Sequence, residues 1–141
     1  MARVVIDTSV LVGALISPAG QNRFVLRACL EGTLKPLIGH SLFLEYEDVL
    51  SRPTLFRSSP LSAAERLELL EAFLSVCEWV EVYFSWRPNL PDESDNHVME
   101  LAVAGRAQML ITQNLRDFER GELTFDHVRV VSPEQLWKET R

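Results

Sequence analysis

Short apolar segments typical of strands alternate with segments typical of helices along the whole sequence, and this alternation constrains the fold more than any other feature. The strand-like segments span residues 3–6, 35–38, 80–84, 109–112 and 128–131. Helical patterns span residues 11–16, 22–30, 41–50, 62–77, 98–104 and 133–137. Strands separated by helices favour a parallel sheet with right-handed crossovers. We therefore predict an α/β protein: a three-layer α/β/α fold with a central parallel sheet of four to five strands.

Length and composition predict one soluble globular domain over residues 1–141. A chain of 141 residues is long enough to bury a core, and neither a linker nor a repeat interrupts it. Hydrophobic residues make up 47% and charged residues 24%, which excludes a disordered chain. Cys29 and Cys77 lie in apolar helical surroundings without a CxxC spacing, so we expect both to be buried apolar residues.

The first 16 residues have a superficial likeness to a secretory signal. Asp7 interrupts their apolar run, and a carboxylate at that position argues against export. No apolar stretch approaches the roughly 20 residues that cross a bilayer. We expect a cytoplasmic protein that does not enter a membrane, and the sparse cysteines fit a reducing compartment.

Four carboxylates lie near the ends of predicted elements. Asp7 directly follows the strand at 3–6, and Asp117 follows the strand at 109–112 by five residues. Asp95 opens a helix, and Glu45 borders the apolar face of the helix at 41–50. The carboxyl ends of parallel strands face one crevice, where these acids can converge. Converging carboxylates repel one another unless a cation lies between them, and oxygen-only ligands suit Mg²⁺ or Mn²⁺.

Each of these acids also has a plain structural interpretation when it is taken alone. Asp7 can cap the helix that follows it, and Glu45 can pair with an arginine at a helix border. Asp92 and Asp95 can both cap a helix start, although Asp95 is closer to the turn that approaches the sheet and is favoured for metal. Asp117 can be an ordinary loop residue on the surface. The metal-site prediction therefore depends on the four acids taken together.

Four segments, in this order, resemble the PIN-domain ribonucleases, notably the VapC-like toxin components of bacterial toxin–antitoxin pairs. They are VVIDTS (4–9), EYEDVLSRP (45–53), PDESDN (91–96) and LITQNLRDF (110–118). The resemblance extends over nearly the whole chain. It implies a parallel α/β/α fold, an acidic site that depends on Mg²⁺ or Mn²⁺, and RNA as the substrate. It also implies a homodimer and a cognate antitoxin protein.

The resemblance assigns roles to individual residues. Asp7, Glu45, Asp95 and Asp117 would be the catalytic acids, and Asp7, Asp95 and Asp117 would bind the metal. Ser9 and Thr112 would support the acids through hydrogen bonds, and Asp92 lies beside them.

This chain has Asn114 where many family members have an aspartate. A branch of the family that resembles this sequence has the asparagine together with an aspartate three residues later, at Asp117 here. Asn114 can still accept a hydrogen bond from water, but it contributes no charge. Either Asn114 or Asp117 therefore completes the predicted site.

The predicted reaction is hydrolysis of an RNA phosphodiester bond. The metal would lower the pKa of a water molecule, and Glu45 would orient or deprotonate that water. The net charge of −6 opposes nucleic-acid binding in general. Four of the 20 acids belong to the predicted site, however, and 12 of the 14 basic residues are arginines, which suit phosphate contacts.

Two other functions stay open. One is a PIN-fold module that has lost turnover and only binds a partner protein; a nuclease assay with and without chelator separates it from an enzyme. The other is a phospho-acceptor domain of the response-regulator kind, which needs an acidic pair after the first strand and a lysine after the last. Thr8 and Ser9 follow Asp7, and the only lysines are Lys35 and Lys138, so this function is disfavoured.

Histidines and tryptophans add little at this level. His40, His97 and His127 are not spaced as a zinc-binding pair. Trp79, Trp86 and Trp137 have the chemistry to stack on bases, although packing is favoured for at least two of them.

Overall fold

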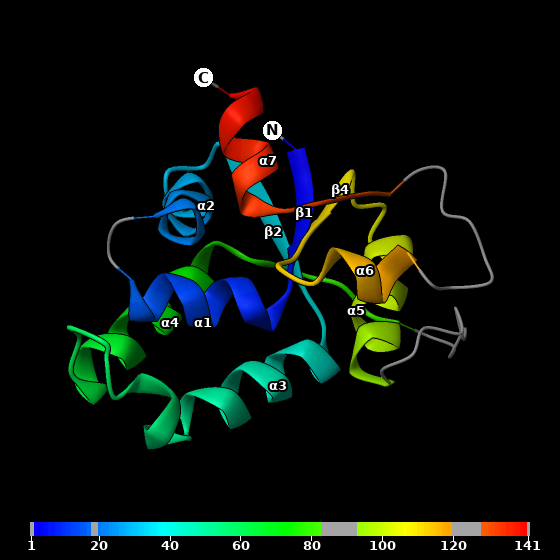
Figure 1. Ribbon diagram of the computed structural model, residues 1–141. Coiled ribbons are helices and arrows are strands. Elements are labelled where there is room, and N and C mark those ends of the chain that lie inside the picture. Colours follow the sequence, from blue (N-terminus) through cyan, green and yellow to red (C-terminus); the bar gives the residue numbers. More distant parts are fainter. Residues whose placement is uncertain (1, 18–19, 83–92, 120–127, 141) are drawn as a thin grey trace.

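A five-stranded parallel sheet forms the centre of the molecule (Figure 1). The computed structural model describes residues 2–17, 20–82, 93–119 and 128–140, apart from the side chains of residues 93–95 and 119. The strands are β1 (Ala2–Ile6), β2 (Leu34–Ile38), β3 (Glu78–Trp79), β4 (Met109–Ile111) and β5 (Arg129–Val131), in the order β3-β2-β1-β4-β5. The predicted fold class is confirmed.

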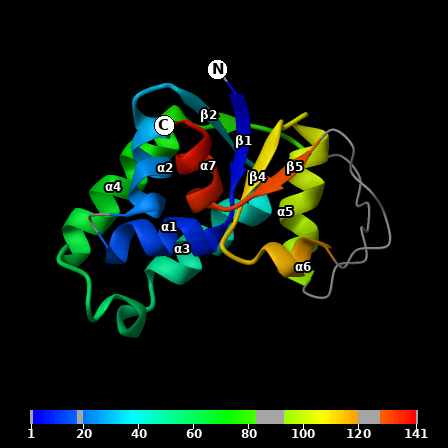
Figure 2. The same ribbon diagram turned by 45° about the horizontal axis from the view of Figure 1, so that its top comes forward.

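Helices cover both faces of the sheet. They are α1 (Thr8–Ile16), α2 (Gln21–Leu30), α3 (His40–Leu50), α4 (Ala63–Val76), α5 (Glu93–Ala104), α6 (Leu115–Glu119) and α7 (Pro133–Glu139), with a 3₁₀ helix at Pro53–Phe56. Figure 2 shows the strands between α2 and α7 on one side and α5 on the other. Helix α5 contacts β1, β2 and β4, and α3 contacts both α1 and α5.

The core explains why the short strand segments form a sheet. Val4 and Val5 of β1 are fully buried, as are Leu110 and Ile111 of β4. Strands buried on both faces read as continuous apolar runs, which is the pattern of parallel sheets covered by helices. Each such side chain contributes on the order of 2 kcal/mol by leaving water.

Serines at the starts of the helical patterns at 62–77 and 133–137 predict caps at Ser62 and Ser132, and hydrogen bonds confirm both. Ser62 caps α4 by accepting from the backbone N–H of Glu65, whose side chain accepts from the N–H of Ser62. Ser132 and Gln135 form the same reciprocal arrangement at α7. These capping boxes satisfy backbone donors that the helix itself leaves without partners.

The serine at the start of the helical pattern at 41–50 predicts a cap at Ser41, and this prediction is wrong. Helix α3 begins one residue earlier, at His40, and its N-cap is Gly39. Close packing explains a glycine there, because a Cβ at this position would lie 3.2 Å from Cδ1 of Leu101 and 3.3 Å from the carbonyl oxygen of Val80. The chain therefore turns from β2 into α3 without a capping side chain.

The third strand was predicted too late in the sequence. Strand β3 consists of Glu78 and Trp79, paired with the end of β2, and the chain leaves the sheet after the N–H of Val80 donates to Ile38. The guanidinium of Arg3 fixes this register with hydrogen bonds of 2.8 and 2.7 Å to the Glu78 carboxylate. Residues 83 and 84 of the predicted strand lie outside the described residues. The segment 86–91, whose prolines predict a loop, also lies outside them.

Apolar residues at helical spacing in the segment 62–77 predict a stripe on α4 that packs into the core, and this stripe is only partly core. Leu70 and Phe73 are buried, as predicted, but Leu67 is 54% exposed. The prediction for the cysteines holds for Cys29, which is buried, whereas Cys77 is half-buried. Burial raises the pKa of each thiol to about 12, so both stay neutral at physiological pH.

The sheet has a topological switch point at β1. The chain adds β2 and then β3 on one side of β1, and then crosses to add β4 and β5 on the other side. Open α/β sheets bind ligands in the crevice outside the carboxyl ends of the strands at such a point. Among the described helices, none has the length and apolar character needed to cross a bilayer.

Candidate active site

Asp7 lies at the switch point, immediately after β1. Its backbone N–H donates to the carbonyl of Ile111 at 2.9 Å, which joins it to the end of β4. Its Oδ1 accepts the backbone N–H of Thr8 at 2.9 Å as the N-cap of α1. The carboxylate is nevertheless only 5% exposed, far more buried than an ordinary helix cap requires. The capping interpretation is therefore correct, but it does not account for the burial.

Two hydroxyl groups hold the other oxygen of this carboxylate. Oδ2 of Asp7 accepts from Thr112 Oγ1 at 2.6 Å and from Ser9 Oγ at 3.0 Å. The Thr112 hydroxyl itself accepts the N–H of Asn114 at 3.0 Å, and the Ser9 hydroxyl accepts the N–H of Gln113 at 3.2 Å. Because each hydroxyl accepts one backbone proton, its own single proton is available for Asp7. The chain from β4 into α6 thus orients Asp7.

The electrostatics of Asp7 favour a cation beside it. Burial raises the pKa of the Asp7 carboxyl, and the nearby charge of Asp117 raises it further. Hydrogen bonds from Thr112, Ser9 and the N–H of Thr8 oppose this rise. A carboxylate has about four lone-pair sites, and the described residues use three of them, so one site on Oδ1 can still bind a ligand. The three described groups that donate to Asp7 are all neutral.

Glu45 reaches the same region from α3. The hydroxyl of Thr8 donates to Glu45 Oε1 at 2.7 Å, so the residue after Asp7 holds this second carboxylate. Tyr46, which is fully buried, donates from its hydroxyl to the carbonyl of Ile6 at 2.5 Å. Both contacts hold α3 against the end of β1. Figure 1 shows the starts of α1 and α3 close to this strand end, with α6 beside them.

Asp117 lies in a helix rather than in the predicted loop. It occupies the first turn of the five-residue helix α6, and its N–H donates to the carbonyl of Asn114 at 3.1 Å. Its effect on the pKa of Asp7 puts the two carboxylates within electrostatic reach of each other. The side chain of Asn114 is exposed, and its backbone N–H supports Thr112. Asp117 therefore supplies negative charge near Asp7, whereas Asn114 supplies a backbone contact.

The other two predicted acids are placed less completely. Asp95 lies in the first turn of α5, but its side chain is outside the described part, and Asp92 lies outside the described residues. The next residue, Asn96, is only 5% exposed on a helix that contacts β1 and β4. Sequence reasoning did not select Asn96. The position of Asn96 directly after Asp95 in the PDESDN segment was the sequence signal that could have identified it as a candidate site residue.

The donor set suits a hard divalent ion, although the described part of it is incomplete. Among the side chains that the structure describes, no three of His, Cys, Asp or Glu are grouped so as to hold a metal. Two of the three predicted ligands, Asp7 and Asp117, belong to that part. They offer carboxylate oxygens only, as Mg²⁺ and Mn²⁺ prefer. The residues present therefore fit such an ion, with Asp95 as the predicted third ligand.

Comparison with known proteins agrees with this fold. A family model described as PIN domain matches residues 3–116. One similar structure is the crystal structure of VapBC2 from Rickettsia felis bound to a DNA fragment of the VapBC2 promoter. The sequence identity is 15% and the TM-score is 0.62, and the match covers 92% of this chain and 98% of the other chain. DNA-bound VapBC from Salmonella typhimurium is similar at 16% identity and a TM-score of 0.64, over 94% and 99%. No curated protein sequence matches significantly.

Proposed function

This chain belongs to the PIN-domain family, and we propose on that basis that it is a metal-dependent endoribonuclease that hydrolyses RNA phosphodiester bonds. The observation that carries the proposal is the buried carboxylate of Asp7 at the switch point of the sheet. A buried carboxylate is costly unless a cation compensates it, and the described groups that donate to Asp7 are all neutral. Asp117 adds a second negative charge nearby, which increases that need.

Asp7, Asp95 and Asp117 are the proposed metal ligands. Bound Mg²⁺ or Mn²⁺ would polarise the scissile phosphate and make water a better nucleophile at neutral pH. Thr112 and Ser9 orient Asp7 by donating to its Oδ2. Removal of a group that orients a metal ligand in this way usually lowers metal affinity or activity roughly 10- to 100-fold.

Glu45 is the proposed general base. The hydroxyl of Thr8 donates to Oε1 of Glu45 at 2.7 Å and so fixes the orientation of the carboxylate that would take a proton from the attacking water. Thr8 also follows Asp7 directly, so the backbone couples the proposed base to the proposed metal ligand. Thr8 is therefore a positioning residue that sequence analysis did not identify.

The proposed biological role is that of the toxin in a toxin–antitoxin pair. The VapC-like sequence resemblance and the fold similarity to the two VapBC structures support it. On this proposal residues 1–141 form one domain that acts as a cytoplasmic homodimer and binds a cognate antitoxin protein. Light scattering on the purified protein tests whether it is a homodimer, and we expect a mass of twice that of the chain.

Cleavage of RNA by the purified protein tests the proposed activity. We expect single-stranded RNA to be cut with Mn²⁺ or Mg²⁺ and to stay intact with chelator. Asp7→Asn should abolish cleavage. The matched control is Asp48→Asn, which removes an exposed acid of α3 that pairs with Arg52. Equal cleavage by the Asp7→Asn protein would remove Asp7 from the mechanism.

A further inference from the structure

A hollow lies at the carboxyl ends of β2 and β3, at the edge of the sheet where Asp7 follows β1. This β2–β3 cavity has a volume of about 550 Å³ and is lined by Gly39, His40, Trp79, Val82, His97 and Glu100, among others. Cavities of roughly 300–1,000 Å³ are typical of small-ligand sites. Among the residues that the structure describes, the cavity lining includes none of the acids or hydroxyl groups assigned to catalysis.

Trp79 gives the cavity an aromatic wall. Its side chain is 56% exposed, which is unusual for so large an apolar group. One part of the ring packs against Phe43, with the ring centroids 5.5 Å apart and the planes tilted by 55°. The contact with Phe43 limits the movement of the indole while most of it stays open to solvent. A held, exposed aromatic ring is a platform on which a nucleobase can stack.

Carboxylates select which part of a nucleotide can enter. Glu100 lines the cavity and is only 6% exposed, and the exposed Glu81 lies in the same lining. A carboxylate accepts hydrogen bonds and repels phosphate, so the complementary group is one that presents N–H donors. Guanine presents two adjacent donors, N1–H and the N2 amino group, on its Watson–Crick edge. Proteins commonly read unpaired RNA bases on that edge while stacking their faces.

The cavity lies close to the proposed cleavage site. Gly39 follows β2 as Asp7 follows β1, and these neighbouring parallel strands pair from Ala2↔Leu34 to Val5↔Leu37. One strand spacing is about 5 Å, so the cavity begins one to two spacings from the strand end that carries Asp7. Helix α3 also links them, since its first turn lines the cavity and Glu45 lies further along it.

We infer that the β2–β3 cavity binds a guanine base of single-stranded RNA beside the scissile phosphate, with Trp79 stacking on the base and Glu100 accepting its N–H groups. This inference rests on the proposed ribonuclease function. It makes the enzyme selective for sites next to guanosine.

Binding to an RNA that cannot be cut tests the inference separately from catalysis. The protein carries Asp7→Asn throughout, in chelator, and fluorescence anisotropy reports its affinity for labelled pentamers with a central guanosine, inosine or adenosine between uridines. Inosine lacks only the N2 amino group. We expect guanosine to bind most tightly, inosine several-fold more weakly and adenosine weakest. Equal affinity for all three overturns the inference.

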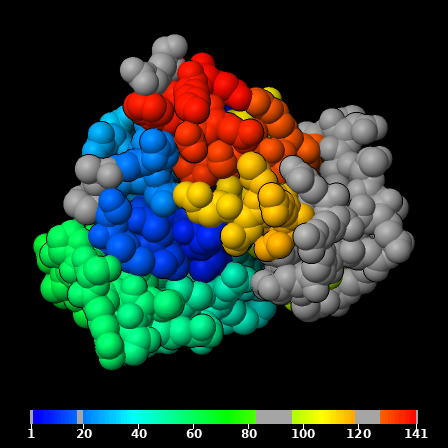
Figure 3. Space-filling model, viewed as in Figure 1, coloured from blue at the N-terminus to red at the C-terminus, as the bar shows by residue number. Residues whose placement is uncertain are grey.

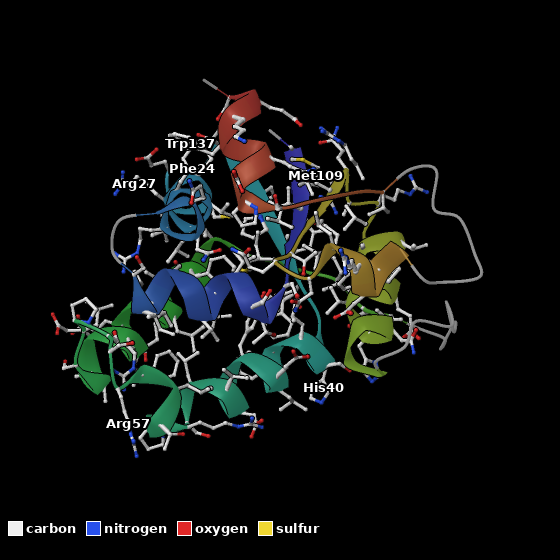
Figure 4. All side chains as sticks on the ribbon, in the orientation of Figure 1. Phe24, Arg27, His40, Arg57, Met109 and Trp137 are labelled. Carbon is white, nitrogen blue, oxygen red and sulfur yellow. The ribbon has the colours of Figure 1, made fainter. Side chains whose placement is uncertain are left out.

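Substitutions in the cavity connect the preference to its walls. Trp79→Leu should weaken binding of the guanosine pentamer about 5- to 150-fold, the range for loss of one base–aromatic stack. Trp137→Leu is the matched control, because Trp137 on α7 lies far from His40 at the cavity (Figure 4). Glu100→Gln should remove the preference for guanosine over adenosine. Thermal melting confirms that each variant is folded.

The outcomes for the two proposals are distinguishable. If the wild-type protein cuts RNA with metal at all bases alike, and Trp79→Leu changes neither affinity nor cleavage pattern, the cavity assignment fails and the ribonuclease function stands. If no RNA is cut under any condition, the ribonuclease proposal fails, and the anisotropy series still decides whether the cavity binds guanine. An unchanged preference for guanosine over adenosine in Glu100→Gln also overturns the guanine assignment.

Discussion

The hydroxyl of Thr112 donates a 2.6 Å hydrogen bond to Oδ2 of Asp7, joining the ends of two adjacent strands that are 105 residues apart in sequence. Thr112 is completely buried and Asp7 nearly so. The bond lies at the point where the strand order reverses, which is where the fold itself provides a crevice. The proposed chemistry depends on this one contact more than on any other.

Removal of that hydroxyl should impair the enzyme without unfolding it. Thr112→Val keeps the shape but removes the donor to Asp7 and the acceptor for the N–H of Asn114. We expect RNA cleavage to fall about 10- to 100-fold, as is usual when the support of a metal ligand is lost. Thr112→Ser keeps the hydroxyl and should retain most activity. Equal rates for the valine and serine variants would show that the hydrogen bond has no catalytic role.

Thr8 and Glu45 should act as one unit. Thr8→Val removes the hydrogen bond to Oε1 of Glu45, and Glu45→Gln removes the proposed base. If Thr8 acts through Glu45, the double variant should be no slower than Glu45→Gln alone, because the effects of coupled residues do not add. Single-turnover cleavage rates of the four proteins measure this coupling. Additive losses would assign Thr8 a separate role.

Asp117, rather than Asn114, should be the acid that matters after β4. Asp117→Asn removes charge close to Asp7 and should lower both metal affinity and cleavage strongly. Asn114→Ala retains the backbone N–H that donates to Thr112, so its effect should be small. Cleavage measured against Mn²⁺ concentration separates the two variants. A larger loss in Asn114→Ala would reverse the assignment.

The Asp7 carboxylate should lower the free energy of unfolding when no metal is present. Its pKa is raised in the folded protein, chiefly by burial, so the folded state holds its proton at pH values where the unfolded state has lost it. The free energy of unfolding therefore falls as the pH rises from the unfolded pKa of about 3.9 through the raised folded value. Above that window the penalty is complete. Asp7→Asn does not titrate and should melt at a higher temperature than the wild type in chelator at pH 7.

Added Mn²⁺ should reverse this order. A ligand that binds only the folded state raises its stability by mass action, so Mn²⁺ should raise the melting temperature of the wild type and leave that of Asp7→Asn unchanged. Scanning calorimetry at pH 7 measures both effects. A wild type that is more stable than Asp7→Asn in chelator would contradict the proposed penalty.

Tyr46 should contribute to stability through its hydroxyl group. The hydroxyl donates to the carbonyl of Ile6 inside the protein, and burial of this group raises the pKa of Tyr46 well above its ordinary value. Tyr46→Phe should lower the free energy of unfolding by about 1 kcal/mol, the usual net value of a buried hydrogen bond. Ser75→Ala is the control, since it removes an exposed hydroxyl that donates to a carbonyl at 2.6 Å. Urea unfolding curves compare the two losses.

The parts of the fold that the sequence predicts are those with strong local signals. The buried runs that became β1 and β4, and the capping boxes at Ser62 and Ser132, depend on nearby residues alone. Helix α6 was missed because five residues carry too little periodicity to identify a helix. Strand β3 was placed too late because its register depends on Arg3, which is 75 residues away from Glu78.

The site follows the same rule. Motifs that follow the predicted strands identify four residues, which the structure brings together at the carboxyl ends of β1 and β4: Asp7, Ser9, Thr112 and Asp117. The contact between Thr8 and Glu45 joins residues 37 positions apart on two helices, and no local pattern reports it. The cavity beside Trp79 depends on the packing of α3 and α5 against β2 and β3. On the face of the molecule drawn in Figure 3, the side chains of α1, α3 and α6 pack closely together.

The most direct test of the central claim is the anomalous diffraction signal of crystals soaked with Mn²⁺. We expect one or two Mn²⁺ peaks beside Oδ1 of Asp7, with Asp95 and Asp117 as further ligands, and no such peak in Asp7→Asn crystals. Wild-type crystals with fully bound Mn²⁺ elsewhere and none beside Asp7 would contradict it.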